Sequence, residues 1–290
     1  MSLRVAVCIA THNRREDLAR TLQALAKLAP APDEILIAAD GCTDGTADFV
    51  RQDFPQICLL IHERALGSIP SRNELAAACT SDIFLSLDDD SYPLELDAVI
   101  RLRALFAAHP RLAVASLPQR TDEHPATLTA ASFGEPHAVG SFANSAAAIR
   151  TAAFREVGAY PGWFFHAYEE PDFALRCLAA GWEVRFETAL TIRHHFTTAQ
   201  RNEIRTHQRH ARNELWSVLL RCPAPQLFAV AAFRATRQFG YAWHRGFVWV
   251  MREPQWWLAF FRGIPRCLAE RKPLPWPDYL AWMQLLRATR

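Results

Sequence analysis

The stretch "FLSLDDDSYP", residues 84–93, decides the fold and raises the first chemical question. It begins as a short apolar run and ends in three consecutive carboxylates, Asp88, Asp89 and Asp90. Two carboxylates about 5 Å apart repel by roughly 3 kcal/mol at an effective dielectric constant near 20, so the triplet predicts a cationic partner. Hard oxygen ligands of this kind suit Mg²⁺ or Mn²⁺. The alternative is that Asp90 or Ser91 caps a following helix, which accounts for one acid but not for three.

Short apolar runs of the same kind recur along the first part of the chain and alternate with helical patterns. They occupy residues 5–10, 34–39, 57–61, 83–87 and 112–117. Such nearly continuous runs are typical of strands buried on both faces. One helix is predicted after Asn13, with Asn13 and Glu16 as a capping pair, and another over residues 94–109. The alternation predicts an α/β fold with a Rossmann-like, largely parallel sheet flanked by helices.

Polar motifs follow three of these predicted strands. They are "THN" at 11–13, "DGCTDGT" at 40–46 and "DDD" at 88–90. Ligands of open α/β sheets bind at the carboxyl ends of the strands, so we expect the three motifs to meet at one edge. Taken alone, "DGCTDGT" is equally typical of an ordinary turn.

A later acidic segment carries the candidate catalytic side chains. "EEPDFALRCLAAGWEV" begins a predicted helix with Glu169, Glu170 and Asp172, and Pro171 is expected at the first helical position. Acids are ordinary at a helix N-terminus. A carboxylate fixed at the cap and facing a cleft can instead act as a general base.

The segment "RHHF" at 193–196 adds a candidate metal ligand. It ends a strand predicted over 183–192, and adjacent strand residues point to opposite faces. Only one of His194 and His195 can therefore reach the cleft. A single histidine at a strand end is also compatible with a purely structural role.

The charge of the chain is divided unevenly between its two parts. Residues 1–200 hold 17 Lys and Arg against 25 Asp and Glu, a balance of −8, whereas residues 201–290 hold 15 against 5, a balance of +10. Seven of the nine Trp lie after residue 215. The pattern predicts a catalytic domain over 1–215 and a basic, Trp-rich helical extension over 216–290. The extension either meets an anionic membrane surface or packs as a structural cap.

The cysteines and the N-terminus favour a cytoplasmic protein. Seven widely spaced cysteines without a Cys-x-x-Cys pair are typical of a reducing compartment. The first apolar run is only about seven residues long and leads into a polar turn, so we interpret it as a strand and not as a signal peptide. No motif or basic tract points to nucleic acid as a partner.

In this order, the motifs resemble those of the inverting family 2 glycosyltransferases of the GT-A fold, of the type that builds bacterial cell-surface polysaccharide. The resemblance covers about residues 3–220 and rests on six segments. They are "VAVCIATHNR", "EILIAADGCTDGT", "GSIPSRN", "FLSLDDDSYP", "FREVGAYPGWFFHAYEEPDFALRCLAAGW" and "HARNELW".

The resemblance implies a role for individual residues. It places the nucleotide of the donor against the ends of the first two strands and against the segments "GSIPSRN" and "FLSLDDDSYP". The residues concerned are Ala10, Thr11, His12, Asn13, Asp40, Arg72, Asp88 and Asp89. It makes Asp88 and Asp90 the D-x-D pair, with Asp90 as the main ligand of Mg²⁺ or Mn²⁺ and His194 favoured over His195 to complete the site. The acid pair is Glu169 and Glu170, and Glu170 is the expected base, with Asp172 as a further candidate. This chain departs from the family pattern at Ala39, Cys42 and Glu170, where relatives often carry Asp, Ser and Asp.

The implied reaction is a metal-assisted single displacement. A hydroxyl of a glycan or lipid-linked acceptor attacks the anomeric carbon of a nucleotide-diphosphate sugar, with UDP- or dTDP-sugars as the expected donors. One alternative is a sugar nucleotidyltransferase, although "IATHNRRED" lacks the glycine-rich phosphate loop that such an enzyme needs. Another is a non-catalytic relative that binds nucleotide sugars. A dehydrogenase is disfavoured because no G-x-G-x-x-G follows the first strand.

Overall fold

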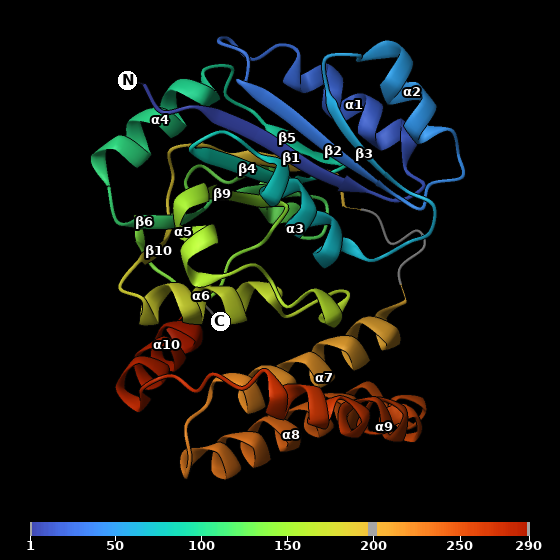
Figure 1. Cartoon of the computed structure of the whole chain (residues 1–290), viewed down its shortest axis with the longest axis vertical. Helices are drawn as coiled ribbons and strands as arrows, with labels where there is room; N and C mark the ends of the chain where they lie inside the picture. The colour runs from blue at the N-terminus through green and yellow to red at the C-terminus, as the bar shows by residue number, and fades with distance from the viewer. Residues whose placement is uncertain (1, 197–201, 289–290) are drawn as a thin grey trace.

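The computed structural model describes residues 2–196 and 202–288, and these form an α/β body with a helical extension below it (Figure 1). The large sheet has eight strands in the order β3-β2-β1-β4-β9-β6-β10-β8. Neighbouring strands are parallel except at β9 and β8, which run antiparallel to their neighbours. The strands are β1 (Val5–Thr11), β2 (Glu34–Asp40), β3 (Cys58–His62), β4 (Ile83–Asp88), β6 (Leu112–Ser116), β8 (His137–Ala138), β9 (Ala146–Arg150) and β10 (Glu183–Phe186).

A second, smaller sheet leaves the large one at the acidic triplet. Its order is β5-β11-β7, with β5 (Ser91–Pro93), β11 (Ile192–His194) and β7 (Gln119–Thr121). The single strand expected over 183–192 is therefore wrong: the chain pairs in the large sheet as β10, then crosses to the small sheet as β11. This crossing carries "RHHF" to the turn that follows β4.

Helices cover both faces of the large sheet because alternate side chains of its strands enter two separate cores. Val5, Val7 and Ile9 of β1 pack on one face with α1, α2 and α4, and Ala6 and Cys8 pack on the other with α3, α5 and α6. The helices of the body are α1 (Arg15–Leu25), α2 (Thr46–Asp53), α3 (Ser68–Ala78), α4 (Ala98–Ala108), α5 (Thr151–Val157) and α6 (Glu169–Ala179), with 3₁₀ turns η1 (Pro125–Thr129) and η2 (Gly162–Phe164). The α/β expectation and its largely parallel sheet are confirmed.

The helix expected over 94–109 is α4, which begins four residues later, at Ala98. Two further details of the expected helices differ. Helix α1 begins at Arg15, and the capping pair of Asn13 and Glu16 does not form, because the Asn13 side chain accepts from the backbone N–H of Thr43 at 2.7 Å. Helix α6 begins at Glu169, so Pro171 is its third residue and not its first. In both cases a polar side chain that was expected to cap a helix lies instead at the edge where the strands end.

Within residues 202–288 the extension forms four helices, and it shares its core with the body. They are α7 (Glu203–Arg221), α8 (Gln226–Arg245), α9 (Phe247–Ala269) and α10 (Trp276–Ala288). Trp216 of α7 and Trp256 of α9 belong to the core that α3, α5 and α6 form with the sheet. The boundary expected after residue 215 falls inside α7. We therefore propose that the extension begins at α7.

Candidate active site

The acidic triplet lies where the two sheets separate. Asp88 is the last residue of β4 and pairs in register with Ala10 of β1, and Ser91 begins β5. The β5–β11 pairing places Ser91 opposite His194. The backbone N–H of His195 donates to the carbonyl oxygen of Asp90 at 2.9 Å. Strand pairing thus fixes the triplet and the histidines beside each other.

Two arginines supply the positive charge that the triplet requires. The Arg14 guanidinium lies 2.9 Å from Asp89 and 2.7 Å from Asp90, and Arg72 of α3 donates to Asp88. Burial raises the pKa of Asp89 to about 7 although Arg14 opposes the shift. Burial also acts on Asp90, but His194 and Arg14 outweigh it and lower the pKa of that carboxyl. Sequence reasoning missed Arg14, whose one indication was the basic pair directly after "THN".

A candidate metal centre lies beside these ion pairs. One ligand atom each from Asp88, Asp90 and His194 lies within 4.8 Å of the others. His194 is buried with its Nε2 3.3 Å from Asp90 Oδ1, whereas Arg14 binds the other oxygen, Oδ2. His195 points elsewhere, and its Nε2 lies 3.0 Å from the Tyr92 hydroxyl. Two carboxylates and one imidazole form a donor set that fits Mg²⁺ or Mn²⁺.

Arg72 connects this centre to the acid pair at the start of α6. It pairs with Asp88 on one side, and its other terminal nitrogen lies 3.8 Å from Glu169 Oε1. Glu169 is buried and also accepts from Asn144 Nδ2 at 3.2 Å, whereas Glu170 is half-buried. Burial and the adjacent Glu170 raise the pKa of Glu169 to about 8, and burial raises the pKa of Glu170. The pair therefore holds a proton more tightly than ordinary carboxylates do.

The segment directly before the acid pair has an unusual backbone. Phe165, Ala167 and Tyr168 have φ values of 70°, 75° and 70°, a region that residues other than glycine rarely adopt. Strained backbone of this kind persists only where the surrounding structure holds it in place, and it is concentrated at functional sites.

Asn213 of α7 holds this strained segment in place. Its fully buried side chain donates from Nδ2 to the carbonyl oxygens of Phe164, His166 and Ala167, at 3.2, 2.9 and 2.7 Å. Gly67 packs so closely on Phe165 from the other side that a Cβ atom there would lie 2.5 Å from the Phe165 carbonyl oxygen. A residue of the extension therefore helps to fix the position of the acid pair in the body.

The residues expected to face the nucleotide lie together at the ends of β1 and β2. Ala10 is half-buried, and buried Thr11 donates to Asp89 at 2.8 Å. His12 is exposed and its Nδ1 bonds the carbonyl oxygen of Asp40. The Asp40 carboxylate accepts from the backbone N–H groups of Leu66 and Gly67, at 2.7 and 2.8 Å. Asp40 thus holds the loop before α3, and Ala10 and His12 are the more accessible members of the group.

Asp172 does not join this site. It is fully buried, and its oxygens accept from Arg176 at 2.9 Å, Ser217 at 2.9 Å and Arg221 at 3.1 Å. These partners lower its pKa below the usual range in spite of its burial. The carboxylate is committed to ion pairs that join α6 to α7, so the expectation of a catalytic role is replaced by a structural one.

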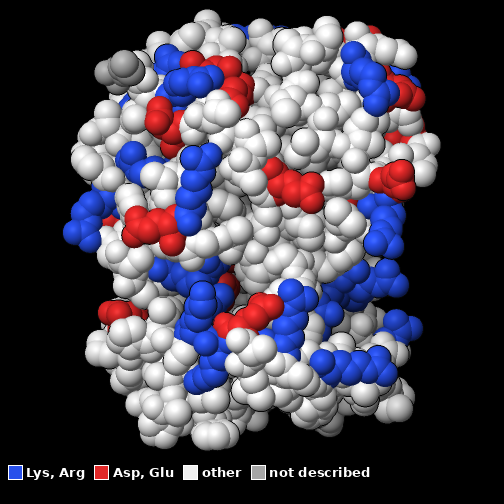
Figure 2. Space-filling view, in the orientation of Figure 1, with Lys and Arg blue, Asp and Glu red and all other residues white. Residues whose placement is uncertain are grey.

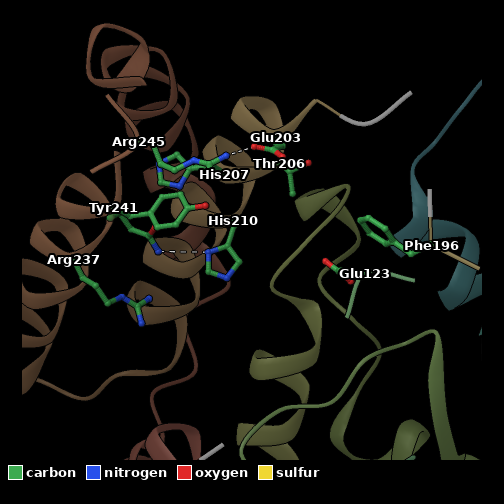
Figure 3. Close-up of a pocket in the computed structure, with 10 residues that line it drawn as sticks. Glu123, Phe196, Glu203, Thr206, His207, His210, Arg237, Tyr241 and Arg245 are labelled. Carbon is green, nitrogen blue, oxygen red and sulfur yellow. Dashed lines mark hydrogen bonds and ion pairs between the residues drawn. The ribbon is translucent and has the colours of Figure 1, made fainter. Parts of the chain in front are cut away.

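A pocket of about 620 Å³ opens between the body and the extension (Figure 3). Its walls mix aromatic rings with polar side chains, among them Tyr241 and Arg237 of α8 and His210 of α7. The His210 ring lies 5.1 Å from that of Tyr168, the residue before the acid pair. His210 thus connects the wall of the pocket to the segment directly before the acid pair.

Comparisons with known proteins agree with this geometry. The model of glycosyl transferase family 2 matches residues 6–152, and that of glycosyl transferase family group 2 matches residues 83–286. The pre-mycofactocin glycosyltransferase of Mycobacterium tuberculosis is 28% identical over 222 residues, which cover 69% of this chain. The match spans only 44% of the length of that relative.

Solved structures show the same fold at low sequence identity. S. aureus TarS 1-349 in complex with UDP-GlcNAc has a TM-score of 0.60 at 17% identity, covering 93% of this chain and 84% of that one. The mannosyltransferase PcManGT from Pyrobaculum calidifontis, in complex with GDP-Man and Mn²⁺, has a TM-score of 0.58 at 17% identity and covers 99% and 85%. GalNAc-T7 with UDP, GalNAc and Mn²⁺ has a TM-score of 0.62 at 14% identity and covers 77% and 49%. The GT-A expectation is confirmed.

Proposed function

The chain belongs to glycosyl transferase family 2, and from this we propose that it moves a sugar from a nucleotide-diphosphate donor to an acceptor hydroxyl with inversion at the anomeric carbon. The observation that carries the proposal is the position of Arg72, which contacts both Asp88 and Glu169. A donor diphosphate beside Asp88 and an acceptor beside the acid pair would then be neighbours. This arrangement suits a direct transfer and favours a glycosyltransferase over a sugar nucleotidyltransferase or a non-catalytic binder.

Donor binding is proposed at the edge formed by β1, β2 and β4. Ala10 and His12 would contact the base and ribose of a UDP- or dTDP-sugar, with Thr11, Asn13, Asp40 and Asp89 fixing the loops around it. Similar structures contain UDP, UDP-GlcNAc or GDP-Man, which supports a nucleotide-sugar donor as a class. Asp88, Asp90 and His194 would hold Mg²⁺ or Mn²⁺. When bound, such an ion neutralises the charge that develops on a departing diphosphate.

The acid pair supplies the base. We propose Glu170 for this role because it is half-buried, whereas Glu169 is buried behind it and bonded to Asn144. Two adjacent carboxyl groups with raised pKa values share protons, so one of the pair can accept the proton of an attacking hydroxyl while the other remains protonated. The strained segment clamped by Asn213 would keep Glu170 in the direction of the acceptor.

The acceptor is proposed to enter through the pocket between the body and the extension. Aromatic rings next to hydrogen-bonding side chains suit a sugar ring, and Tyr241 and His210 offer both. A glycan or a lipid-linked saccharide fits this chemistry. We place the enzyme in the cytoplasm, peripheral to the inner face of the membrane, where nucleotide sugars are available. No helix of the described residues is long and apolar enough to cross a bilayer.

The test is a screen of nucleotide sugars with and without Mn²⁺. We expect one donor class to raise the melting temperature only when Mn²⁺ is present, and the same donor to be hydrolysed slowly without an acceptor. Asp90→Asn should abolish the Mn²⁺-dependent shift, while Asp97→Asn, at a half-exposed carboxylate of the body that pairs with Arg101, should preserve it. A shift that is insensitive to EDTA in the Asp90→Asn variant would contradict the proposed metal centre.

A further inference from the structure

Helix α8 carries large apolar side chains on its outer face. The residues that it buries include Arg234 and Gln238, which both bond the fully buried Glu214 of α7. From residue 228 to residue 243 every exposed residue of α8 is uncharged, and Phe228 and Trp243 are 76% and 64% exposed. A helix at a water-facing surface normally shows the opposite pattern, with polar residues outward. The outer face of α8 is therefore built for an apolar environment.

Helix α9 continues this surface with a regular stripe. Seven exposed and uncharged residues follow each other at spacings of four and three: Phe247, Met251, Pro254, Leu258, Phe261, Pro265 and Leu268. These spacings place them along one side of the helix. The two stripes meet at the turn between the helices, where Trp243, Phe247 and Met251 are 64%, 77% and 62% exposed. We call this region the α8–α9 corner.

The charges around the corner indicate which partner covers it. The extension has a balance of +10, and Arg252 and Arg262 are exposed and form no ion pair with any residue in the described ranges. Figure 2 shows that the lowest rim of the extension is almost free of charged residues, while basic residues gather above it. An uncharged rim below a collar of basic residues (Figure 2) matches the layers of a bilayer surface, with apolar chains beneath anionic headgroups.

A second copy of the chain fits this surface less well. A symmetric contact would bring the same patch of both molecules together, and so would set Arg252 of each beside the like-charged collar of the other. An anionic lipid surface instead attracts every arginine that reaches it. No helix of the described residues is long and apolar enough to cross the bilayer, and amphipathic helices of this kind lie in the plane of its surface.

We propose that the α8–α9 corner docks the protein on an anionic lipid surface, inserting Trp243, Phe247 and Met251 among the lipids with Arg252 and Arg262 at the headgroups. The inference rests on the proposed function for its biological purpose, because docking would hold the acceptor pocket close to lipid-linked saccharides. Docking itself requires neither donor nor acceptor, so the docking proposal and the proposed function can fail separately.

The experiment compares three full-length proteins by co-sedimentation with vesicles. The first is the natural chain, the second carries Trp243→Ser, Phe247→Ser and Met251→Ser, and the third carries Leu94→Ser, Leu96→Ser and Ile100→Ser on the body. The control positions are 42%, 58% and 52% exposed, so they remove exposed apolar side chains away from the corner. Vesicles are made of phosphatidylcholine alone or mixed with phosphatidylglycerol.

We expect the natural and control chains to bind the mixed vesicles at low salt and the corner variant to bind at least roughly tenfold more weakly. Salt should weaken binding of the natural chain, and Arg252→Gln with Arg262→Gln should reduce its preference for phosphatidylglycerol. A natural chain that ignores the mixed vesicles at low salt overturns the proposal. A corner variant that binds the vesicles normally also overturns it. So does a natural chain that forms a dimer and binds no vesicles, if the corner substitutions convert that dimer to a monomer. Thermal stabilisation by the donor with Mn²⁺, measured on the same samples, tests the proposed function independently.

Discussion

Glu170 is the residue whose replacement separates binding from chemistry most directly. Glu170→Gln keeps the size of the side chain but removes its ability to accept a proton. We expect turnover to fall by about 10²- to 10⁴-fold, the usual contribution of general base catalysis, while donor affinity is retained. Steady-state kinetics and calorimetry with the donor measure the two effects. Glu156→Gln, an exposed position on α5, is the matched control, and near-normal turnover of Glu170→Gln would transfer the role to Glu169.

The raised pKa values of the acid pair make activity and stability respond to pH in opposite directions. A base must be ionised, so turnover should rise with pH beyond the range of an ordinary carboxyl group. The pKa of folded Glu169 is about 8 against a usual value of 4.5, so the folded chain binds its proton more tightly than the unfolded chain. Its contribution to stability is therefore complete below the usual value and is lost as the pH rises toward the folded value.

Glu169→Gln tests this stability effect. The variant cannot ionise, so it should gain melting temperature relative to the natural chain as the pH is raised from about 5 to about 8. For a chain of this size, each kcal/mol of stabilisation corresponds to roughly 2–4 °C. Scanning calorimetry in a series of buffers measures the difference. A difference that stays constant across the series would show that Glu169 is already ionised in the folded chain.

Some contacts of individual site residues could be predicted from the sequence, and others could not. The acidic triplet predicted a cationic partner, and the structure supplies Arg14 and Arg72, of which only Arg72 was anticipated at the site. Arg14 was missed because a basic residue next to a predicted helix start has no distinctive pattern. The structural partners of Asp172 were not anticipated because Ser217 and Arg221 are distant in the chain, and local sequence cannot reveal such pairing.

At the level of elements, the contact between α7 and the segment before α6 is the one most open to test. Asn213→Ala would remove the donor that three carbonyl oxygens share, one of them in a buried and two in part-buried hydrogen bonds, and should cost roughly 1–3 kcal/mol. Because the freed segment carries Glu170, we also expect turnover to fall while the donor still binds. Asn202→Ala removes only the cap of α7, which costs about 1 kcal/mol, and is the control. Equal turnover in the two variants would limit Asn213 to a structural role.

The elements of the large sheet were predictable because buried parallel strands are short apolar runs, and β1 to β4 and β6 lie within a residue of the expected positions. The small sheet was not predictable. β5, β7 and β11 have three residues each, and their pairing depends on where the chain leaves the large sheet. The ends of α1 and α6 were misplaced because Asn13 and Glu169 have partners outside their own helices.

The whole molecule is expected to unfold as one unit. Trp216, Trp256 and Phe260 of the extension share a core with Ala6 and Cys8 of the sheet, and Asp172 binds Arg221 across the boundary. A chain that ends at residue 215 would expose this core and should aggregate or lose its melting transition. The full chain should melt in one transition, which calorimetry and circular dichroism detect together. A stable, cooperative fragment of 1–215 would contradict this expectation.

The hydrogen bonds from Asn213 to the strained segment also have a consequence for synthesis on the ribosome. The chain emerges from its N-terminus, so the sheet, the acidic triplet and the acid pair are all made before α7. Until Asn213 appears, the carbonyl oxygens of His166 and Ala167 lack the donor that holds the strained segment, in which Phe165, Ala167 and Tyr168 have positive φ. A nascent or prematurely terminated chain would therefore carry the parts of the site without its final geometry. The hydrogen bonds that hold the segment before the acid pair can therefore form only after α7 has been made.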